Sequence, residues 1–205
     1  MPTFARHILA RAAVLVLSVC GVVVLSGPGA SAATTADTAC PASGHLTYTL
    51  ARAANPTADQ NAAYALITTA MNQALSVYNC QVNLTKALTV RYEPSVSTAD
   101  ANWNGTIRFG ARSTMQQITA MHEISHTLGV GTVSAWSPKL SNGIWTGSNA
   151  TARLRSITRD QAASVHGDRQ HFWPYGLNYT SEVSSQADLV SHCLMVAALR
   201  QDMGL

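Results

Sequence analysis

Three short segments in the first half of the chain alternate apolar and polar residues and contain Thr, Tyr or Val, a pattern typical of half-buried strands. They are residues 45–50, 88–92 and 106–109. A polar stretch over 95–104 lies between the second and third segments and predicts a loop. The first half of the chain therefore predicts a small sheet.

Apolar residues that recur at helical spacing predict two helices in the same region. The first runs from 58 to about 78, behind a capping box that begins at Thr57. The second follows a capping box that begins at Ser113, and it stops at Gly129, where glycine can adopt the left-handed conformation that ends helices. Its apolar stripe consists of Met115, Ile118, Met121, Ile124 and Leu128.

The second half of the chain is rich in Gly, Ser, Asn and Trp and predicts longer irregular segments. We expect residues 131–150 to be irregular with a hairpin at 143–147, and residues 167–179 to form an aromatic loop. A short helix is expected over 150–156, and a last helix over 184–203. Together, the elements predict one α+β domain that ends with a C-terminal helix.

The N-terminal residues have the organisation of an export signal. Arg6 and Arg11 provide positive charge, residues 12–25 are apolar, and small residues at 30–32 form a cleavage site. We therefore expect a signal peptide over 1–32 and a single secreted domain over 33–205, which is long enough for one core. No later apolar run reaches the roughly twenty residues of a membrane helix. We expect an extracellular monomer that does not contact the membrane after signal removal.

Charge and cysteine content narrow the possible functions. The chain has 13 basic and 10 acidic residues, and they are scattered without a basic stripe, which argues against a nucleic-acid partner. In an oxidising compartment we favour a disulfide between Cys40 and Cys80, which would tie the N-terminus to the end of the first helix. Cys193 lies on an apolar helix and is expected to be a buried free thiol. Other pairings stay open at this point.

The second predicted helix contains His122-Glu123-Ile124-Ser125-His126. A spacing of four residues places both imidazoles on one helical face, where each can offer a nitrogen to the same zinc ion. Glu123 can then reach a water on that ion and take its proton as the water attacks a carbonyl group. The motif therefore predicts His122 and His126 as ligands of one Zn²⁺ and Glu123 as the general base.

The segment HEISHTLG, from His122 to Gly129, resembles the active-site helix of zincin metallopeptidases, and its glycine resembles that of the metzincin branch. In metzincins a third ligand, His or Asp, follows three residues after this glycine, but this sequence has Thr132 there. The resemblance covers the catalytic helix and little of the remaining chain. It implies a zincin-like fold with a small twisted sheet, an active-site helix beneath it and a substrate that lies along an edge strand. Residues 106–109 are the candidate edge strand.

A catalytic zinc ion usually has three protein ligands and an open position, so another residue must complete the site. We favour His171, because it opens the aromatic segment 171–179, which could hold one imidazole rigidly. A packed loop residue is the alternative interpretation of His171. The other candidate ligands are His166, Asp168, Glu182 and His192, of which the last lies on an apolar helix and is more typical of a core residue.

Several aromatic and sulfur side chains could contribute to the site. Tyr175 and Tyr179 could donate a hydrogen bond to the oxyanion that forms during attack, and Tyr175 is the preferred catalytic candidate, although aromatic packing explains both equally well. Met195 could form the methionine floor found in metzincins, or it could belong to the core. Three tryptophans could line a substrate cleft or bind sugar rings: Trp136, Trp145 and Trp173.

The sequence thus favours a secreted zinc-dependent endopeptidase that acts on a peptide or protein substrate. A second hypothesis is a secreted module that binds a glycan or a protein and has a structural or catalytically incomplete zinc site, because Thr132 does not supply the missing ligand. Glu123 argues against this module, since a structural zinc ion needs no general base. A third hypothesis is the hydrolysis of a non-peptide amide.

Overall fold

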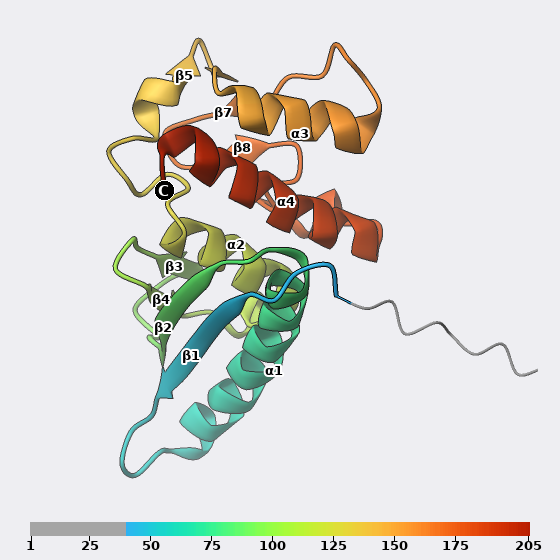
Figure 1. Cartoon of the computed structure of the whole chain (residues 1–205). Coiled ribbons are helices and arrows are strands. Elements are labelled where there is room, and N and C mark those ends of the chain that lie inside the picture. The colour runs from blue at the N-terminus through green and yellow to red at the C-terminus, as the bar shows by residue number, and fades with distance from the viewer. Residues whose placement is uncertain (1–39) are drawn as a thin grey trace, which may run out of the picture. The chain divides into compact units, whose positions relative to one another are not determined.

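The structure is a computed structural model that describes residues 40–205, so the expected signal peptide over 1–32 and the start of the expected domain over 33–205 lie outside the described residues. The strands are β1 (His45–Ala51), β2 (Thr85–Tyr92), β3 (Ala99–Ala101), β4 (Thr106–Phe109), β5 (Leu140–Ser141), β6 (Ile144–Trp145), β7 (His166–Gly167) and β8 (Phe172–Trp173) (Figure 1). The α-helices are α1 (Ala58–Gln81), α2 (Gln117–Thr127), α3 (Ser148–Thr158) and α4 (Gln186–Met203), and three short 3₁₀ helices are η1 (Arg112–Thr114), η2 (Ser137–Lys139) and η3 (Thr180–Glu182). These elements confirm the α+β class.

The first sheet has the strand order β1-β2-β4-β3, in which β1, β2 and β4 run parallel and β3 runs antiparallel to β4. Parallel neighbours need a crossover connection, which the long helix α1 supplies between β1 and β2. The strands bury alternate residues in a core that also contains the apolar faces of α1 and α2. These strand residues are Leu46, Leu88, Val90, Ile107 and Phe109. This core holds α2 against the sheet.

The sheet ends at β1 on one side and on the other at β3, the edge strand that packs against α2, so the prediction that residues 106–109 form the edge was wrong. Those residues form β4, which lies between β2 and β3. The edge strand has only three residues, Ala99–Ala101, and Ala and Asp have little preference for strands. The sequence therefore predicted a loop at the position where the sheet ends.

Helix α2 begins later than predicted, and the capping box expected at Ser113 is wrong. That residue lies in η1, and α2 begins at Gln117. The N–H groups of Gly110 and Ala111 both donate to the carbonyl oxygen of Thr98 beside the edge strand, which holds this segment on the sheet before the helix begins. At the other end Gly129 has a φ of +113°, as expected for the residue that stops the helix.

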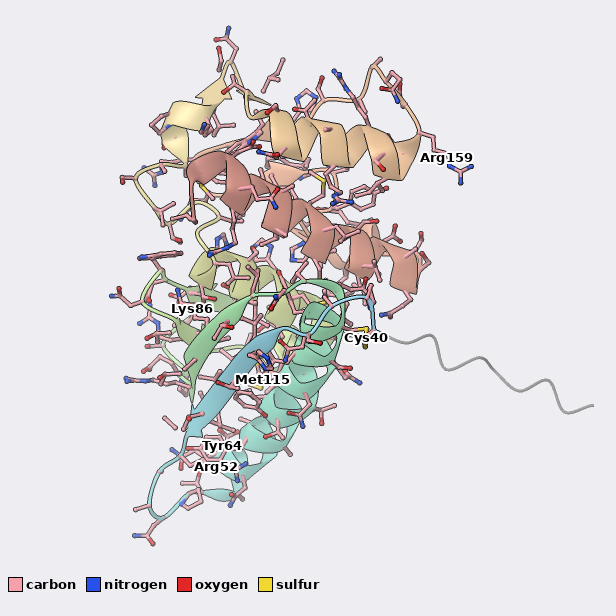
Figure 2. All side chains as sticks on the ribbon, viewed as in Figure 1. Cys40, Arg52, Tyr64, Lys86, Met115 and Arg159 are labelled. Atoms are coloured by element: carbon pink, nitrogen blue, oxygen red, sulfur yellow. A yellow bond between two sulfur atoms is a disulfide. The ribbon has the colours of Figure 1, made fainter. Side chains whose placement is uncertain are left out.

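Two cationic side chains from distant parts of the chain bind the last carbonyl groups of α2. Lys86, labelled in Figure 2, donates from Nζ to Thr127 O at 2.6 Å, and Arg200 donates from Nη1 to Leu128 O at 2.5 Å. Positive charge at the C-terminal end of a helix is favourable because the unpaired carbonyl groups carry partial negative charge. These contacts fix the end of α2 directly after His126.

A second sheet, of four two-residue strands in the order β5-β6-β7-β8, lies within the second half of the chain, where the sequence predicted irregular segments. Strands β5 and β6 form a hairpin whose turn is Asn142-Gly143, with positive φ at both residues, close to the hairpin expected at 143–147. Strands of two residues are too short to produce an alternating pattern, which explains why they were missed. Helix α4 ends at Gly204, which has a φ of +75°.

The predicted disulfide between Cys40 and Cys80 is present, and Cys193 is buried and free, as predicted. Figure 2 labels Cys40 at the start of the described chain. The bridge connects this end to the last turn of α1. Within residues 40–205, no helix has the length and apolar character that crossing a membrane requires.

Candidate metal centre

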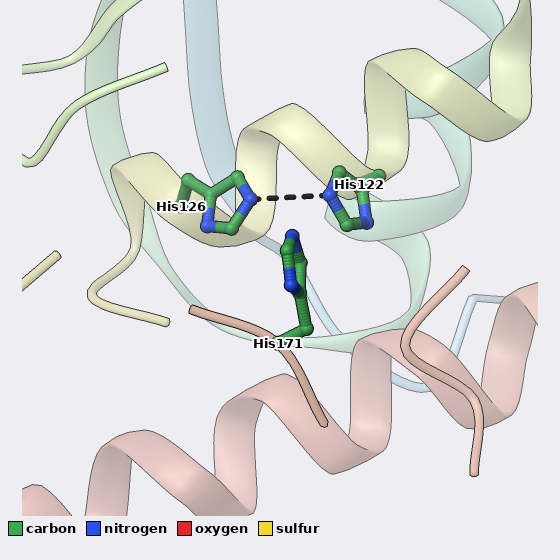
Figure 3. A group of neighbouring side chains, drawn as sticks. All are labelled: His122, His126 and His171. Carbon is green, nitrogen blue, oxygen red and sulfur yellow. Dashed lines mark hydrogen bonds between the residues drawn. The ribbon is translucent and has the colours of Figure 1, made fainter. Parts of the chain in front are cut away.

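His122 and His126 lie one turn apart on α2 and point their Nε2 atoms at each other across 3.1 Å (Figure 3). Each ring is oriented by a backbone carbonyl group at its other nitrogen. The Nδ1 of His122 is 3.0 Å from Gly176 O, and the Nδ1 of His126 is 2.8 Å from Val130 O. Because a carbonyl oxygen only accepts hydrogen bonds, both Nδ1 atoms carry the proton and both Nε2 atoms keep a lone pair.

This arrangement of two lone pairs suits a bound cation. When both rings are neutral, no proton lies between the two Nε2 atoms. Their lone pairs then repel each other unless a cation binds both of them. Burial, with a contribution from nearby His126, lowers the pKa of His122 to about 3, and burial also lowers the pKa of His126, so both rings are neutral near pH 7. Nitrogens bound tetrahedrally to zinc at about 2.0–2.1 Å lie roughly 3.3 Å apart, close to the observed separation.

His171 brings a third imidazole to the same point from a different part of the chain. It lies directly before β8, in the turn that follows β7, and its ring stacks on that of His122 with centroids 5.5 Å apart (Figure 3). One ring nitrogen from each of His122, His126 and His171 lies within 4.8 Å of the others. The three histidines that the sequence favoured as ligands are therefore close enough to hold one metal ion.

Asp168 orients His171 and is not itself part of the histidine group. Its carboxylate lies 3.4 Å from Nδ1 of His171 and accepts the backbone N–H groups of Gln170 and His171 at 2.7 Å each. Burial alone would raise the pKa of Asp168, but these hydrogen bonds lower it. Carboxylates that bind the outer nitrogen of a histidine are common partners of metal ligands, because they fix the ring and increase its basicity.

The other three candidate ligands lie elsewhere. His166 is exposed on β7, and Glu182 accepts the backbone N–H groups of Leu177 and Tyr179. His192 is completely buried, and its Nδ1 lies 2.7 Å from Tyr175 O, so it is the core residue that its apolar helix predicted. Of the candidate third ligands, His171 is therefore the residue whose ring nitrogen lies with those of His122 and His126.

Glu123 lies in the same cleft as the three histidines. Its side chain is only 5 % exposed, and Oε2 has no hydrogen-bond partner in the described part of the chain. Burial raises its pKa to about 8, and the negative charge of Asp100 adds to this effect. A carboxylate that is buried without a partner is unfavourable, and a cation held by the histidines would offset this cost.

The cleft has a volume of about 410 Å³ and extends from the histidines to the edge strand. Besides the three histidines and Glu123, its walls consist of Thr98, Ala99, Asp100, Ala101, Thr114, Thr119, Thr132, Gln170, Leu177 and Asn178. The edge strand β3 forms one wall, and the segment around His171 forms another.

Strand β3 directs backbone hydrogen-bonding groups to its outer edge, where the one protein contact within residues 40–205 is from the hydroxyl of Thr98 to Ala99 O at 3.3 Å. Gly110 N–H donates to Thr98 O, and Asn102 N–H donates to Thr106 O, so residues 98 and 102 pair with β4. Because pairing alternates along an antiparallel strand, Ala99 and Ala101 direct their N–H and C=O groups away from β4. The sequence pattern did not predict this strand. Only the resemblance to zincins, which implies a substrate along an edge strand, indicated that a strand should lie beside the active-site helix.

Thr132, which stands where a metzincin has its third ligand, has a different contact. Its hydroxyl donates to the backbone oxygen of His126 at 2.6 Å. The turn before Thr132 also lies close to the segment that carries His171. Gly131 has a φ of +65°, and a Cβ atom there would overlap the backbone of Gln170, the residue before His171. The chain after His126 and the chain before His171 therefore meet backbone to backbone.

The aromatic residues contribute less to the cleft than the sequence indicated. Tyr175 packs partly buried against the core and is not among the cleft-lining residues, so its role as oxyanion donor stays a prediction. Trp136 and Trp145 are 1 % and 3 % exposed, so the hypothesis that they line a cleft or bind sugar is wrong. Trp173 lies beside His171, with ring centroids 6.2 Å apart, and Met195 is completely buried in the core.

Comparisons of the chain with protein-family models, with curated proteins and with solved structures found no match. The interpretation of the site therefore depends on its own geometry and chemistry.

Proposed function

We propose that this chain is a secreted zinc metallopeptidase with a zincin-like fold, in which His122, His126 and His171 hold one zinc ion and Glu123 is the general base. The observation that supports this proposal is the convergence of three imidazoles at a cleft that also contains a buried glutamate. Export is part of the proposal. It is supported by the N-terminal sequence and by a disulfide, a bond that is typical of oxidising compartments.

The donor set fits zinc. Three imidazole nitrogens with a cleft beside them correspond to the three protein ligands and open position of catalytic zinc sites, whereas structural sites use four protein ligands. Bound there, a zinc ion would polarise a carbonyl group and make water a nucleophile near neutral pH.

Glu123 would move the proton in both halves of the reaction. Its carboxylate would accept a proton from the attacking water, whose oxygen forms a bond to the carbonyl carbon of the substrate. The same proton would then pass to the leaving nitrogen as the C–N bond breaks. The reaction consumes one water molecule and forms no covalent bond between enzyme and substrate.

The edge strand would position the substrate backbone. The outward N–H and C=O groups of Ala99 and Ala101 can pair with an extended peptide, as happens where peptides add to the edge of a sheet. A peptide on this edge would pass through the cleft that contains Glu123. This placement supports an endopeptidase.

Zinc content and casein hydrolysis, measured together, test the proposal. We expect the parent protein to bind one zinc ion and to cleave casein, and Glu123→Gln to keep the metal but to lose activity at least about a hundredfold. His171→Ala should lose metal and activity. His166→Ala is the matched control, because this exposed histidine lies five positions before His171 and outside the site, and it should retain both properties.

Two results would refute the peptidase. One is a parent protein without zinc, and the other is a Glu123→Gln variant that cleaves as fast as the parent. In either case the binding module that the sequence left open would replace it.

A further inference from the structure

The walls of the cleft are small and polar. Among the residues that line it, only Leu177 is an apolar residue larger than alanine, and none is aromatic apart from the three histidines. Four threonines, a glutamine and an asparagine provide most of the other side chains. A large apolar side chain would bury these hydroxyl and amide groups without giving them partners, which is unfavourable.

The cleft also provides no unbalanced charge for a charged side chain. Asp100 lies on its rim, but Arg108 donates to both of its carboxylate oxygens, through Nε at 2.7 Å and through Nη2. No lysine or arginine is among the cleft-lining residues. Glu123 is the only other carboxylate there, and the proposed reaction uses it.

Three of the four threonine hydroxyls in the walls already have backbone partners. Thr98 donates to Ala99 O, Thr114 donates to Thr98 O and Ala111 O, and Thr132 donates to His126 O. These three residues therefore shape the cleft and leave little hydrogen-bonding capacity for a ligand.

Thr119 and Gln170 are different. Within residues 40–205, neither side chain makes a hydrogen bond to another protein group, although both line the cleft. Thr119 lies on α2 three residues before His122 and four before Glu123, so it shares their helical face. Gln170 directly precedes His171. One free hydroxyl and one free amide thus lie close to the metal ligands, on two sides of the cleft.

We infer that the substrate side chain that enters this cleft is uncharged and forms hydrogen bonds, and that Thr119 and Gln170 determine this preference. The preferred class is therefore a peptide with Ser, Thr, Asn or Gln next to the scissile bond. This inference depends on the proposed peptidase function and specifies its substrate class.

Fluorogenic peptides that differ at one position by isosteric pairs provide the test. The pairs are Thr against Val, Asn against Leu and Gln against Met, placed in turn on each side of the scissile bond. We expect the polar member of a pair to have a higher kcat/KM by roughly tenfold at one of these positions, the factor that one additional hydrogen bond gives. Thr119→Val and Gln170→Met should each reduce this ratio without loss of bound zinc.

Thr69→Val is the matched control, since this threonine is exposed on α1 and bonds only to Ala65 O of its own helix. It should leave the ratio unchanged. Preference for the apolar members, or an unchanged ratio in both Thr119→Val and Gln170→Met, would overturn the inference and leave the peptidase intact. If a zinc-loaded parent cleaves no peptide of the set and no casein, the proposed function itself fails.

Discussion

His122 and His192 direct their Nδ1 atoms to consecutive carbonyl oxygens of the same loop. His122 bonds to Gly176 O at 3.0 Å, and His192 bonds to Tyr175 O at 2.7 Å. On its other side, Nε2 of His192 lies 2.8 Å from the hydroxyl of Tyr78 and 3.2 Å from Met121 O, the carbonyl of the residue before His122. Because the neutral ring carries its proton on Nδ1, His192 holds the loop that orients His122, and its Nε2 accepts the hydroxyl of Tyr78 beside the backbone that carries His122.

Removal of this buried contact should weaken metal binding. We expect His192→Leu to reduce zinc affinity about 10- to 100-fold, the usual effect of losing an outer partner of a metal ligand. His192→Asn should keep most of the affinity, because its amide N–H group can replace the Nδ1 donor. Competition with a chelator of known zinc affinity measures both values.

The control for this experiment is Leu199→Ala, which removes a completely buried side chain about two turns further along α4. It should lower the free energy of unfolding by about 2–5 kcal/mol and leave zinc affinity unchanged. Equal zinc affinities in His192→Leu and the parent protein would show that the loop does not need His192.

His192 also makes the folded state sensitive to acid. Burial lowers its pKa from 6.5 to about 4. The groups that face it are the Tyr78 hydroxyl and the carbonyl oxygens of Met121 and Tyr175, and the ring of Phe172 stacks on it. As the pH falls from 6.5, the unfolded chain takes up a proton that the folded chain does not, so stability is lost until the pH reaches about 4.

We expect this residue to lower the free energy of unfolding by roughly 3 kcal/mol across that window. Urea denaturation of the parent and of His192→Asn at several pH values measures the effect. His122 and His126 are present in both proteins, so the difference between the two pH profiles reports His192 together with its smaller electrostatic effect on those two rings. Parallel profiles between pH 6.5 and 4 would contradict the prediction.

Asp168→Asn should also weaken the metal site, through His171. The variant keeps an oxygen for the backbone N–H groups of the turn but removes the negative charge beside the imidazole, so we expect zinc affinity to fall about tenfold or more. Asp160→Asn is the control, since Asp160 accepts the N–H of Ala162 at 2.8 Å in a similar turn outside the site. Isothermal titration with zinc compares them, and equal losses in the two variants would refute a specific role for Asp168.

Ala101→Pro tests the edge strand. Proline is tolerated on an edge strand where the N–H group points away from the sheet, so the pairing of β3 with β4 should survive. The variant removes one outward N–H donor, and we expect kcat/KM for casein-derived peptides to fall about tenfold at unchanged zinc content. An unchanged kcat/KM in a folded variant would indicate that the substrate does not pair with β3.

The sequence predicted correctly the site residues that belong to a single helix. His122, Glu123 and His126 lie within two turns of one helix, so their spacing alone placed them on one face. His171 was favoured because an aromatic segment follows it, and the structure brings it to the other two. Its partner Asp168 was considered only as a competing ligand, because a sequence does not distinguish a ligand from the group that orients one.

Contacts between segments distant in sequence were less predictable. The carbonyl groups of Val130 and Gly176 orient the two helical histidines, yet every residue has a carbonyl group, so the sequence offers no signal for them. Strand β3 was missed because Ala99–Ala101 is too short and too small for a strand pattern. The aromatic ring of Tyr175 is recognisable in the sequence, whereas its packing against the core could not be predicted from it.

The backbone contact between Gly131 and Gln170 has a consequence for the order in which the protein matures. His122, Glu123 and His126 share one helix, whereas His171 reaches the other histidines only after the second sheet has docked and this close contact has formed. A newly made chain would therefore have the helix with His122 and Glu123 before it has a complete ligand set. If the protein is a peptidase, this order would limit proteolysis of one copy by another. Incompletely folded chains are the most easily cleaved, and none of them would yet have the complete metal site that cleavage needs.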